Sequence, residues 1–334
     1  MNQQKSLNFF RNNFIIVLFA LLFIASSFAF PSFFTLENIG NLVRMAAING
    51  LLAAGVTYVI ICGSIDISVG SVMAFSGCII GWMSNAGLEI PGVILALLSG
   101  VFSGFLIALM IVQFKMPPFI ASLVIMQSVR GIVFITTNYE QIGMNSMSPG
   151  LAFIGRGAFM NIFTVPALIM AIVMVVTSYI FRRTNIGRSM YAVGGNIEAA
   201  KMMGLKVDWT RYFAHMMCGG LAALAGLVLA CRMGAVSSVT GEMAEMQAIA
   251  ATVLGGTLLT GGVGKISGTF FGVMFIATLT NFFNMLSGVN TFWQQVITGF
   301  LLLVVVLSQS ISKDSAFRKI RKTEEAARTA AVSR

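Results

Sequence analysis

The chain has 334 residues, of which 57% are hydrophobic and only 10% are charged. Soluble domains carry about a quarter charged residues, so this composition excludes an ordinary soluble protein and indicates an integral membrane protein. The formal net charge is +10, but most basic residues flank apolar segments. We therefore expect membrane lipid as a partner of these residues and no nucleic acid.

The amino-terminal region imitates a secretory signal peptide, because Lys5 and Arg11 precede the apolar stretch 14–30. That stretch is long for the apolar part of a signal peptide and has no clean small-residue cleavage site. Many further apolar segments follow it. We expect it to remain in the protein as the first membrane span.

Ten segments of the chain have roughly the 20 mostly apolar residues that a membrane-spanning helix needs. They are 14–30, 41–62, 67–85, 92–112, 118–136, 162–181, 212–231, 246–262, 268–286 and 292–310. The predicted fold class is an all-α polytopic membrane protein with about ten transmembrane helices. Eight spans with two re-entrant segments are the alternative. One transmembrane domain covers residues 1–312, and residues 313–334 form a basic tail.

The distribution of Lys and Arg predicts which loops face the cytoplasm. The longest polar loop, 182–211, is strongly basic, and basic loops between spans stay on the cytoplasmic side. Alternating ten spans from this loop places both termini and the tail 313–334 in the cytoplasm as well. Four basic residues then fall at or near the outer surface: Arg44, Arg130, Arg156 and Arg232.

The stretch 63–70, GSIDISVG, joins the second and third predicted spans and is too rich in glycine for a continuous helix. Irregular backbone at membrane depth must be buried in protein or line a cavity. Asp66 lies in this stretch. It is expected either to cap the third span or to lie at the inner mouth of a transport pathway, because ionisable groups inside membranes concentrate at such places. A second glycine-rich stretch, 255–268, has the same character.

The loop 182–211 contains a predicted short helix in its second half. Asn196 is its expected N-cap, Glu198 lies in the first turn, where the helix dipole favours an acid, and Gly204 ends it. A solvated connector is the plain interpretation of such a loop. An apolar surface on a polar, cytoplasmic helix indicates instead an element that docks on a partner.

No enzymatic or metal-binding motif is present in the sequence. There is one histidine, His215, which we expect to be an ordinary helix residue, and there is no GxxxxGK[ST] phosphate-binding loop. The four cysteines form no CxxC pair, so we expect packing roles for them and neither metal nor cofactor. Few acids run through the predicted spans, which disfavours an ion-coupled secondary transporter. A pathway driven by a separate subunit fits these absences, and the chain itself is expected not to be an enzyme.

Four stretches together resemble the permease subunits of bacterial ATP-binding-cassette (ABC) sugar importers of the ribose/arabinose/xylose group. They are GSIDISVGSV at 63–72, MPPFIASLVIMQSVRG at 116–131, RRTNIGRSMYAVGGNIEAAKMMGL at 182–205 and GGTLLTGGVGKISGTFFG at 255–272. The resemblance implies a permease domain in a bacterial inner membrane that translocates a monosaccharide. It also implies an ATP-binding subunit with two nucleotide-binding modules, a periplasmic sugar-binding protein and a second permease chain, identical or different. Importers of nucleosides, autoinducers or branched-chain amino acids share the superfamily and are the alternatives.

In such permeases a cytoplasmic coupling helix docks on the ATPase, and its glutamate-alanine-alanine-x3-glycine pattern fits this loop. The resemblance therefore assigns ATPase coupling to the following residues: Gly195, Asn196, Glu198, Ala199, Ala200 and Gly204.

The last two predicted spans carry polar and aromatic side chains near their outer ends. Such groups suit a sugar pathway, although polar contacts between helices explain them equally well. The pathway candidates are Asp66, Asn281, Asn284, Trp293, Gln294 and Gln295. Arg44 and Arg156 are the candidates for docking the binding protein, with anchoring to lipid headgroups as the alternative.

Overall fold

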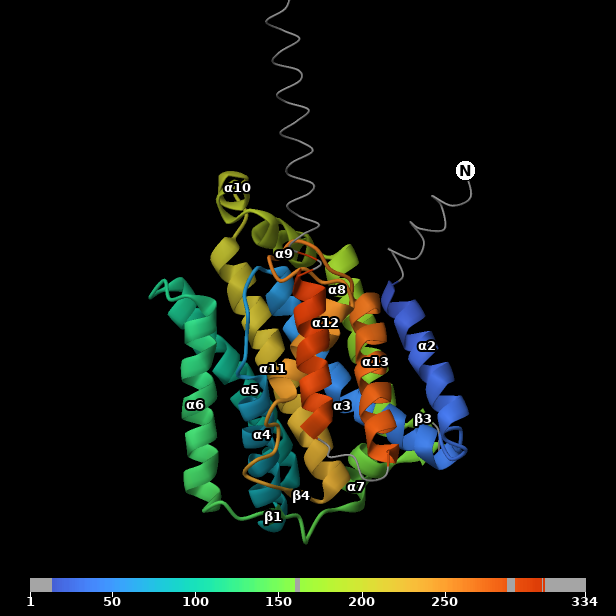
Figure 1. Ribbon diagram of the computed structural model, residues 1–334. Helices are drawn as coiled ribbons and strands as arrows, with labels where there is room; N and C mark the ends of the chain where they lie inside the picture. Colours follow the sequence, from blue (N-terminus) through green and yellow to red (C-terminus); the bar gives the residue numbers. More distant parts are fainter. Residues whose placement is uncertain (1–13, 160–162, 287–291, 308, 310–334) are drawn as a thin grey trace, which may run out of the picture.

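The computed structural model describes residues 14–159, 163–286, 292–307 and 309, which form a helical bundle (Figure 1). Within these residues, six helices are long and apolar enough to cross a membrane. They are α3 (Leu36–Ile61), α5 (Glu89–Val112), α6 (Pro118–Thr137), α8 (Val165–Arg183), α11 (Val207–Met233) and α13 (Ile266–Met285). The prediction of a helical membrane protein is therefore confirmed. The tail 313–334 lies outside the described residues.

The other predicted spans are also helical, but their helices are shorter. They correspond to α2 (Phe14–Ala29), α4 (Val69–Asn85), α12 (Ala244–Leu254) and the helix Phe292–Leu307. Three further helices lie outside the predicted spans: α7 (Pro149–Arg156), α9 (Asn185–Gly195) and α10 (Ile197–Met202). Figure 1 shows α9 and α10 at one end of the bundle and α7 at the other.

Two pairs of very short strands are the only departures from helix among the described regular elements. Strand β1 (Ile142–Gly143) pairs antiparallel with β4 (Ala235–Val236), and β2 (Ala158–Phe159) pairs antiparallel with β3 (Phe163–Thr164). Both pairs lie at the α7 end. The β1–β4 pair ties together connections that are distant in sequence, because β1 follows α6 and β4 follows α11.

Side-chain caps explain why two helices do not begin where hydropathy alone placed them. The hydroxyl of Thr35 accepts a hydrogen bond from the Asn38 N–H, so α3 begins at Leu36, before the predicted residue 41. The Thr164 hydroxyl accepts from the Ala167 N–H, so α8 begins at Val165 and not at 162.

The predicted span 246–262 is wrong in its second half, because α12 ends at Leu254. Gly256, Gly261 and Gly262 all have positive φ angles, +88°, +84° and +72°. This is the left-handed region, which glycine adopts at little cost and which a right-handed helix cannot contain. The segment 255–265 is therefore an irregular connection between α12 and α13.

Helix α11 lies at the centre of the bundle, where it packs against α3, α4 and α5. Its contact with α5 is made through glycines: a Cβ on Gly100 would overlap the carbonyl oxygen of Gly219, and one on Gly104 would overlap that of His215. In lipid, helices associate through such close backbone approach, which small residues permit. The contact holds α11 and the side chain of His215 at a fixed position in the core.

Candidate functional site

The first candidate site is the extended segment 62–68, which connects α3 to α4 through the interior of the bundle. Three polar side chains of this segment are buried: Ser64, Asp66 and Ser68 are each 1% exposed. A polar segment in this position satisfies the condition that irregular backbone at membrane depth be buried in protein. The prediction made for this stretch from its glycines is confirmed.

Asp66 organises the turn that starts α4. One carboxylate oxygen, Oδ1, accepts hydrogen bonds from the Ser68 N–H at 2.8 Å and from the Ser68 hydroxyl at 2.7 Å. Ser68, not Asp66, is the N-cap residue of α4. The prediction that Asp66 is the N-cap is therefore wrong by two residues, and Asp66 instead accepts hydrogen bonds from the cap residue.

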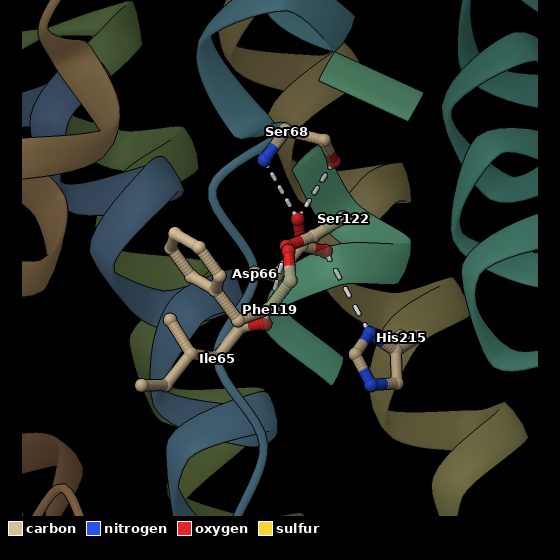
Figure 2. A network of polar contacts seen from close by, with 6 residues as sticks. All are labelled: Ile65, Asp66, Ser68, Phe119, Ser122 and His215. Carbon is tan, nitrogen blue, oxygen red and sulfur yellow. Dashed lines mark hydrogen bonds and ion pairs between the residues drawn. The ribbon is translucent and has the colours of Figure 1, made fainter. Parts of the chain in front are cut away.

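The second oxygen of the same carboxylate faces His215 of α11, as Figure 2 shows. Asp66 Oδ2 lies 3.7 Å from His215 Nδ1, and both side chains are 1% exposed. Removing two such groups from water costs several kcal/mol, and mutual attraction offsets that cost only when the pair stays intact. At 3.7 Å the two groups make no hydrogen bond, and they form an ion pair only when His215 is protonated. Residues so deeply buried line no open pathway in this structure.

Helix α6 supports the segment from another side. The Ser122 hydroxyl donates to the Phe119 carbonyl at 3.0 Å within α6 and reaches the Ile65 carbonyl at 3.4 Å (Figure 2). The extended segment is thus attached through Ile65 to α6 and through Asp66 to α11. His215 was expected to be an ordinary helix residue, and that expectation is wrong. Asp66 and His215 are 149 positions apart in the sequence. The only sequence signal for their contact is that each is an isolated ionisable residue in an apolar region.

The second candidate site is α10, which stands at the outermost point of its end of the bundle (Figure 1). Its N-cap is Asn196, whose side chain accepts from the Ala199 N–H at 3.0 Å. Its stop is Gly204, with a φ of +74°. The short helix predicted in this loop is therefore confirmed, together with its first and last residues. Gly195 precedes the cap and has open space around its Cα.

The sequence predicts an apolar surface on α10 and its end formed by Ala199, Ala200, Met203 and Leu205, and only part of this set faces outward. Ala200 is fully buried against Val193 and Val207, so its side chain fastens α10 to α9 and α11. The large apolar side chains that face outward are Met202 and Met203, which are 83% and 66% exposed. Methionine is flexible and suits a surface that adapts to a partner.

Glu198 and Lys201 form an exposed ion pair on α10, with an N–O distance of 3.4 Å. Tyr191 of α9 lies below it, where burial raises the pKa of its hydroxyl and the nearby Arg182 partly offsets that rise. The neutral hydroxyl donates a hydrogen bond to the Gly264 carbonyl at 2.9 Å. This contact joins α9 to the segment 255–265, and no sequence pattern predicts it.

The pathway candidates on the last helices divide into two groups. Asn281 exchanges hydrogen bonds with Asn38 at 2.8 and 3.2 Å, and Gln294 donates to the Thr280 hydroxyl at 2.6 Å. These two side chains are buried and join helices. The other three are exposed: Asn284, Trp293 and Gln295. The structure thus places only part of this set on a surface that a solute could reach.

Gln295 lines a cavity of about 180 Å³ between the start of α12 and the helix Phe292–Leu307. The cavity is mostly apolar, with Gln247, Met243 and Met246 among its other lining residues. Gln247 accepts a hydrogen bond from Asn49 of α3 at 3.3 Å. A few polar groups in an otherwise apolar hollow are typical of sites for small molecules. Gln247 is the pathway candidate that the sequence reasoning missed.

The four outer arginines lie in different environments. Arg156 is exposed, and its Nε donates to the Arg232 carbonyl at 2.9 Å. Arg44 is half-buried and donates to Asn41 at 3.0 Å. Arg130 donates to the carbonyls of Ser238 and Thr240, so it fastens the connection after β4 to α6. Arg156 is thus the docking candidate with a free surface.

Among the described residues, no group of three or more His, Cys, Asp or Glu side chains could hold a metal ion. In the first candidate site the Ser68 hydroxyl donates to Asp66, and neither ring nitrogen of His215 has a hydrogen-bond partner, so no serine or cysteine among the described residues is hydrogen-bonded to the histidine as a base. The first site holds an irregular segment in the interior of the bundle, and the second presents a short helix at one end of it.

Comparison with known proteins identifies relatives over most of the chain. The family described as "Branched-chain amino acid transport system / permease component" matches residues 38–306. The ribose import permease protein RbsC of Bacillus subtilis is 41% identical over 86% of this chain and 89% of its own length. RbsC of Escherichia coli K12 is 34% identical over 88% of this chain and 91% of its own length.

The xylose transport system permease protein XylH of Escherichia coli K12 is 31% identical over 84% of this chain and 87% of its own length. No solved structure matches the chain at a significant level. The family match spans well over half of the sequence and includes the buried pair, α10 and the glycine-rich segments. The chain belongs to the branched-chain amino acid transport system / permease component family of membrane permeases.

Proposed function

We propose that the protein is the membrane-spanning permease subunit of an ABC importer for a monosaccharide in a bacterial inner membrane. The observation that carries this proposal is the pair of relatives named for ribose and xylose, which are 41% and 31% identical over at least 84% of the chain. A nucleoside, an autoinducer or a branched-chain amino acid is the alternative solute, and the family description favours the last of these.

The proposed permease crosses the membrane ten times. The 17 residues of α4 extend about 26 Å at 1.5 Å per residue, which falls short of the roughly 30 Å of hydrocarbon. The extended segment 62–68 rises about 3.3 Å per residue and supplies the missing length. Helix α12, with 11 residues, extends about 16 Å and covers only part of that thickness. The segment 255–265 turns back on itself, because the Leu258 N–H donates to the Val263 carbonyl at 3.0 Å. Eight crossings would make two of the ten segments re-entrant.

Ten alternating crossings place both termini, α9 and α10 in the cytoplasm, in agreement with the positive-inside rule. Helix α10 is then the coupling helix, which docks on an ATP-binding subunit with two nucleotide-binding modules. Its exposed Met202 and Met203 support this role, because exposed apolar side chains on a polar loop have no use in the membrane. ATP hydrolysis belongs to that subunit, so the permease itself is not an enzyme.

The opposite end of the bundle, which carries α7 and Arg156, faces the periplasmic binding protein. A second permease chain, identical or different, completes the transporter. Gln247 and Gln295 line the 180 Å³ cavity beside α12 and are proposed contacts of the passing sugar, since hydroxyl groups need hydrogen-bonding partners.

Uptake of radiolabelled sugars by proteoliposomes tests this function. The liposomes contain the permease with its ATP-binding subunit and are supplied with the binding protein outside and ATP inside. We expect uptake of ribose or another pentose that requires both ATP and the binding protein. Branched-chain amino acids serve as the control solutes.

Uptake that proceeds without ATP would contradict an ABC importer. ATP-dependent uptake of leucine or valine in preference to any sugar would support an ABC importer and show that its solute is an amino acid. These two outcomes separate the transport mechanism from its specificity.

A further inference from the structure

Three segments that are far apart in the sequence meet where α9 ends. They are the end of α3 with Gly63, the end of α9 with Gly194 and Gly195, and the segment 255–265 that follows α12. At this point their backbones touch one another directly, without side chains between them. We call Gly63, Gly194, Gly261 and Gly262 the glycine junction.

The absence of side chains at the junction is a steric requirement. A Cβ on Gly194 would overlap the carbonyl oxygen of Ile61 and lie 2.6 Å from the Gly262 nitrogen. A Cβ on Gly261 would lie 2.7 Å from the Gly63 Cα and 2.8 Å from the Gly194 oxygen. Real Cβ atoms do not approach backbone atoms this closely, so any larger residue must push two segments apart.

Hydrogen bonds fasten the three segments in this arrangement. The Gly262 N–H donates to the Ile61 carbonyl at 2.9 Å, which joins the segment 255–265 to the end of α3. The Tyr191 hydroxyl donates to the Gly264 carbonyl at 2.9 Å, which joins the same segment to α9. Backbone contacts of this kind have no rotamers to change, so a displacement of one segment must displace the others.

The junction lies between the coupling helix and the membrane interior. Asn196 alone separates α9 from α10, so movement of α10 acts directly on Gly194. Gly63 begins the extended segment that carries Asp66 to its contacts with α11. Gly255, at the other end of the segment 255–265, packs backbone to backbone on Gly268 of α13.

We propose that the glycine junction and Tyr191 are positioning residues for transport: they transmit movement of the docked α10 to both irregular segments, 62–68 and 255–265. The inference rests on the proposed function, because it takes α10 as the element on which the ATPase acts. The contacts of Asp66 hold the far end of the segment 62–68, and the packing of Gly255 on Gly268 holds the far end of 255–265. The junction is therefore the point through which movement of α10 acts on both segments.

A helix glycine outside the proposed sites provides a matched control variant. In Gly194→Ala the new methyl group meets the Ile61 carbonyl, whereas in Gly131→Ala of α6 nothing lies within 4 Å of it. Alanine favours helix over glycine at both positions, so helix propensity cannot explain a difference between them. The measured quantity is the number of solute molecules transported per ATP hydrolysed, in proteoliposomes with the ATP-binding subunit and binding protein.

We expect Gly131→Ala to keep the wild-type ratio and Gly194→Ala to lower it about tenfold, while the ATPase still copurifies and hydrolyses ATP. Tyr191→Phe keeps the ring and removes one hydrogen bond, so we expect about a threefold decrease in the ratio. An unchanged ratio in a folded Gly194→Ala protein overturns the inference. If that variant does not assemble, an unchanged ratio in Tyr191→Phe overturns it.

A second measurement does not depend on the identity of the solute. Hydrogen–deuterium exchange of peptides that cover 62–68 and 255–265 is compared with and without nucleotide on the ATP-binding subunit. We expect nucleotide to change exchange in both segments of the wild-type and Gly131→Ala proteins, and in neither segment of Gly194→Ala. If the wild-type protein takes up no sugar but shows these exchange changes, the proposed solute is refuted and the role of the junction is supported. Equal changes in both variants would refute the junction.

Discussion

Asp66 is the residue on which most of the interior polar contacts converge. Its carboxylate accepts two hydrogen bonds from Ser68 and faces His215, and all three side chains are 1% exposed. Breaking a buried pair by removing one partner leaves the other without compensation in a low-dielectric interior. The two halves of this carboxylate can be tested separately, because Oδ1 supports the α4 turn and Oδ2 faces α11.

Asp66→Ala removes both functions, and we expect it to lower the stability of the folded protein by about 3–5 kcal/mol. Asp66→Asn keeps an amide oxygen for the Ser68 N–H and hydroxyl and loses only the charge that faces His215, so its loss should be clearly smaller. Thermal unfolding in detergent measures the difference. Equal losses for the two variants would show that the Ser68 hydrogen bonds contribute nothing.

Lys201→Ala is the surface control for this series. It also removes one partner of an ion pair, but the Lys201 and Glu198 side chains are 54% and 78% exposed. Exposed pairs contribute at most about 1 kcal/mol, so the melting temperature should hardly change.

At the scale of the elements, α10 shows how a helix shorter than two turns can be predicted from sequence. Its cap and stop are both local: Asn196 accepts from Ala199, and Gly204 takes a left-handed conformation. Local chemistry of this kind depends on neighbours in the sequence and can be recognised there. The direction of its side chains depends on α9 and α11, which is why the burial of Ala200 could not be foreseen.

Disrupting the exposed face of α10 should uncouple the transporter. Met202→Asp places a charge where an apolar side chain is 83% exposed, and Glu198→Lys reverses a charge beside it. For Met202→Asp we expect weaker binding of the ATP-binding subunit by about 2 kcal/mol, or about thirtyfold. Titration of the purified subunit onto the permease in nanodiscs measures this affinity. Wild-type affinity in both variants would exclude α10 as the docking element.

The helix Phe292–Leu307 offers a test of which polar side chains face the pathway. Gln294 is 6% exposed and bonds to Thr280, whereas its neighbour Gln295 is exposed and lines the 180 Å³ cavity. We expect a polar thiol reagent added from outside to label Gln295→Cys and to leave Gln294→Cys unlabelled. Cys62, Cys78, Cys218 and Cys231 are all buried, so the wild-type protein gives a low background. Equal labelling of the two variants would remove Gln295 from the pathway.

At the scale of the whole molecule, the sequence predicts the helices better than the contacts between them. All ten apolar segments contain helix, because hydrophobicity at membrane length is a local property that the bilayer imposes. The buried partner of Asp66, the contact of Tyr191 with Gly264 and the early end of α12 depend on segments brought together only by the fold. The glycines of 255–265 could be recognised as irregular, but their meeting with Gly63 and Gly194 could not.

The end of the molecule opposite α10 carries a charge distribution that bears on how a binding protein would approach. Arg156 is exposed at the end of α7, and β4 and the connection after α6 lie at the same end (Figure 1). Arg130 lies on α6 but donates to the carbonyls of Ser238 and Thr240, so it holds the fold and is unavailable to a partner. Variants of these two arginines can therefore test docking and stability separately.

Arg156→Glu should raise the binding-protein concentration needed for half-maximal uptake by about tenfold at low ionic strength and much less at high salt. The reason is that peripheral charges act mainly on the rate of encounter, which salt screens. Its backbone acceptor, the Arg232 carbonyl, stays accessible to water, so the melting temperature should change little. Arg44→Glu is the second test, since Arg44 bonds only to the neighbouring Asn41 among the described contacts. Arg130→Ala should instead lower the melting temperature, because two carbonyls lose their donor. Concentration dependence that is unchanged at low salt in both glutamate variants would identify Arg44 and Arg156 as lipid anchors.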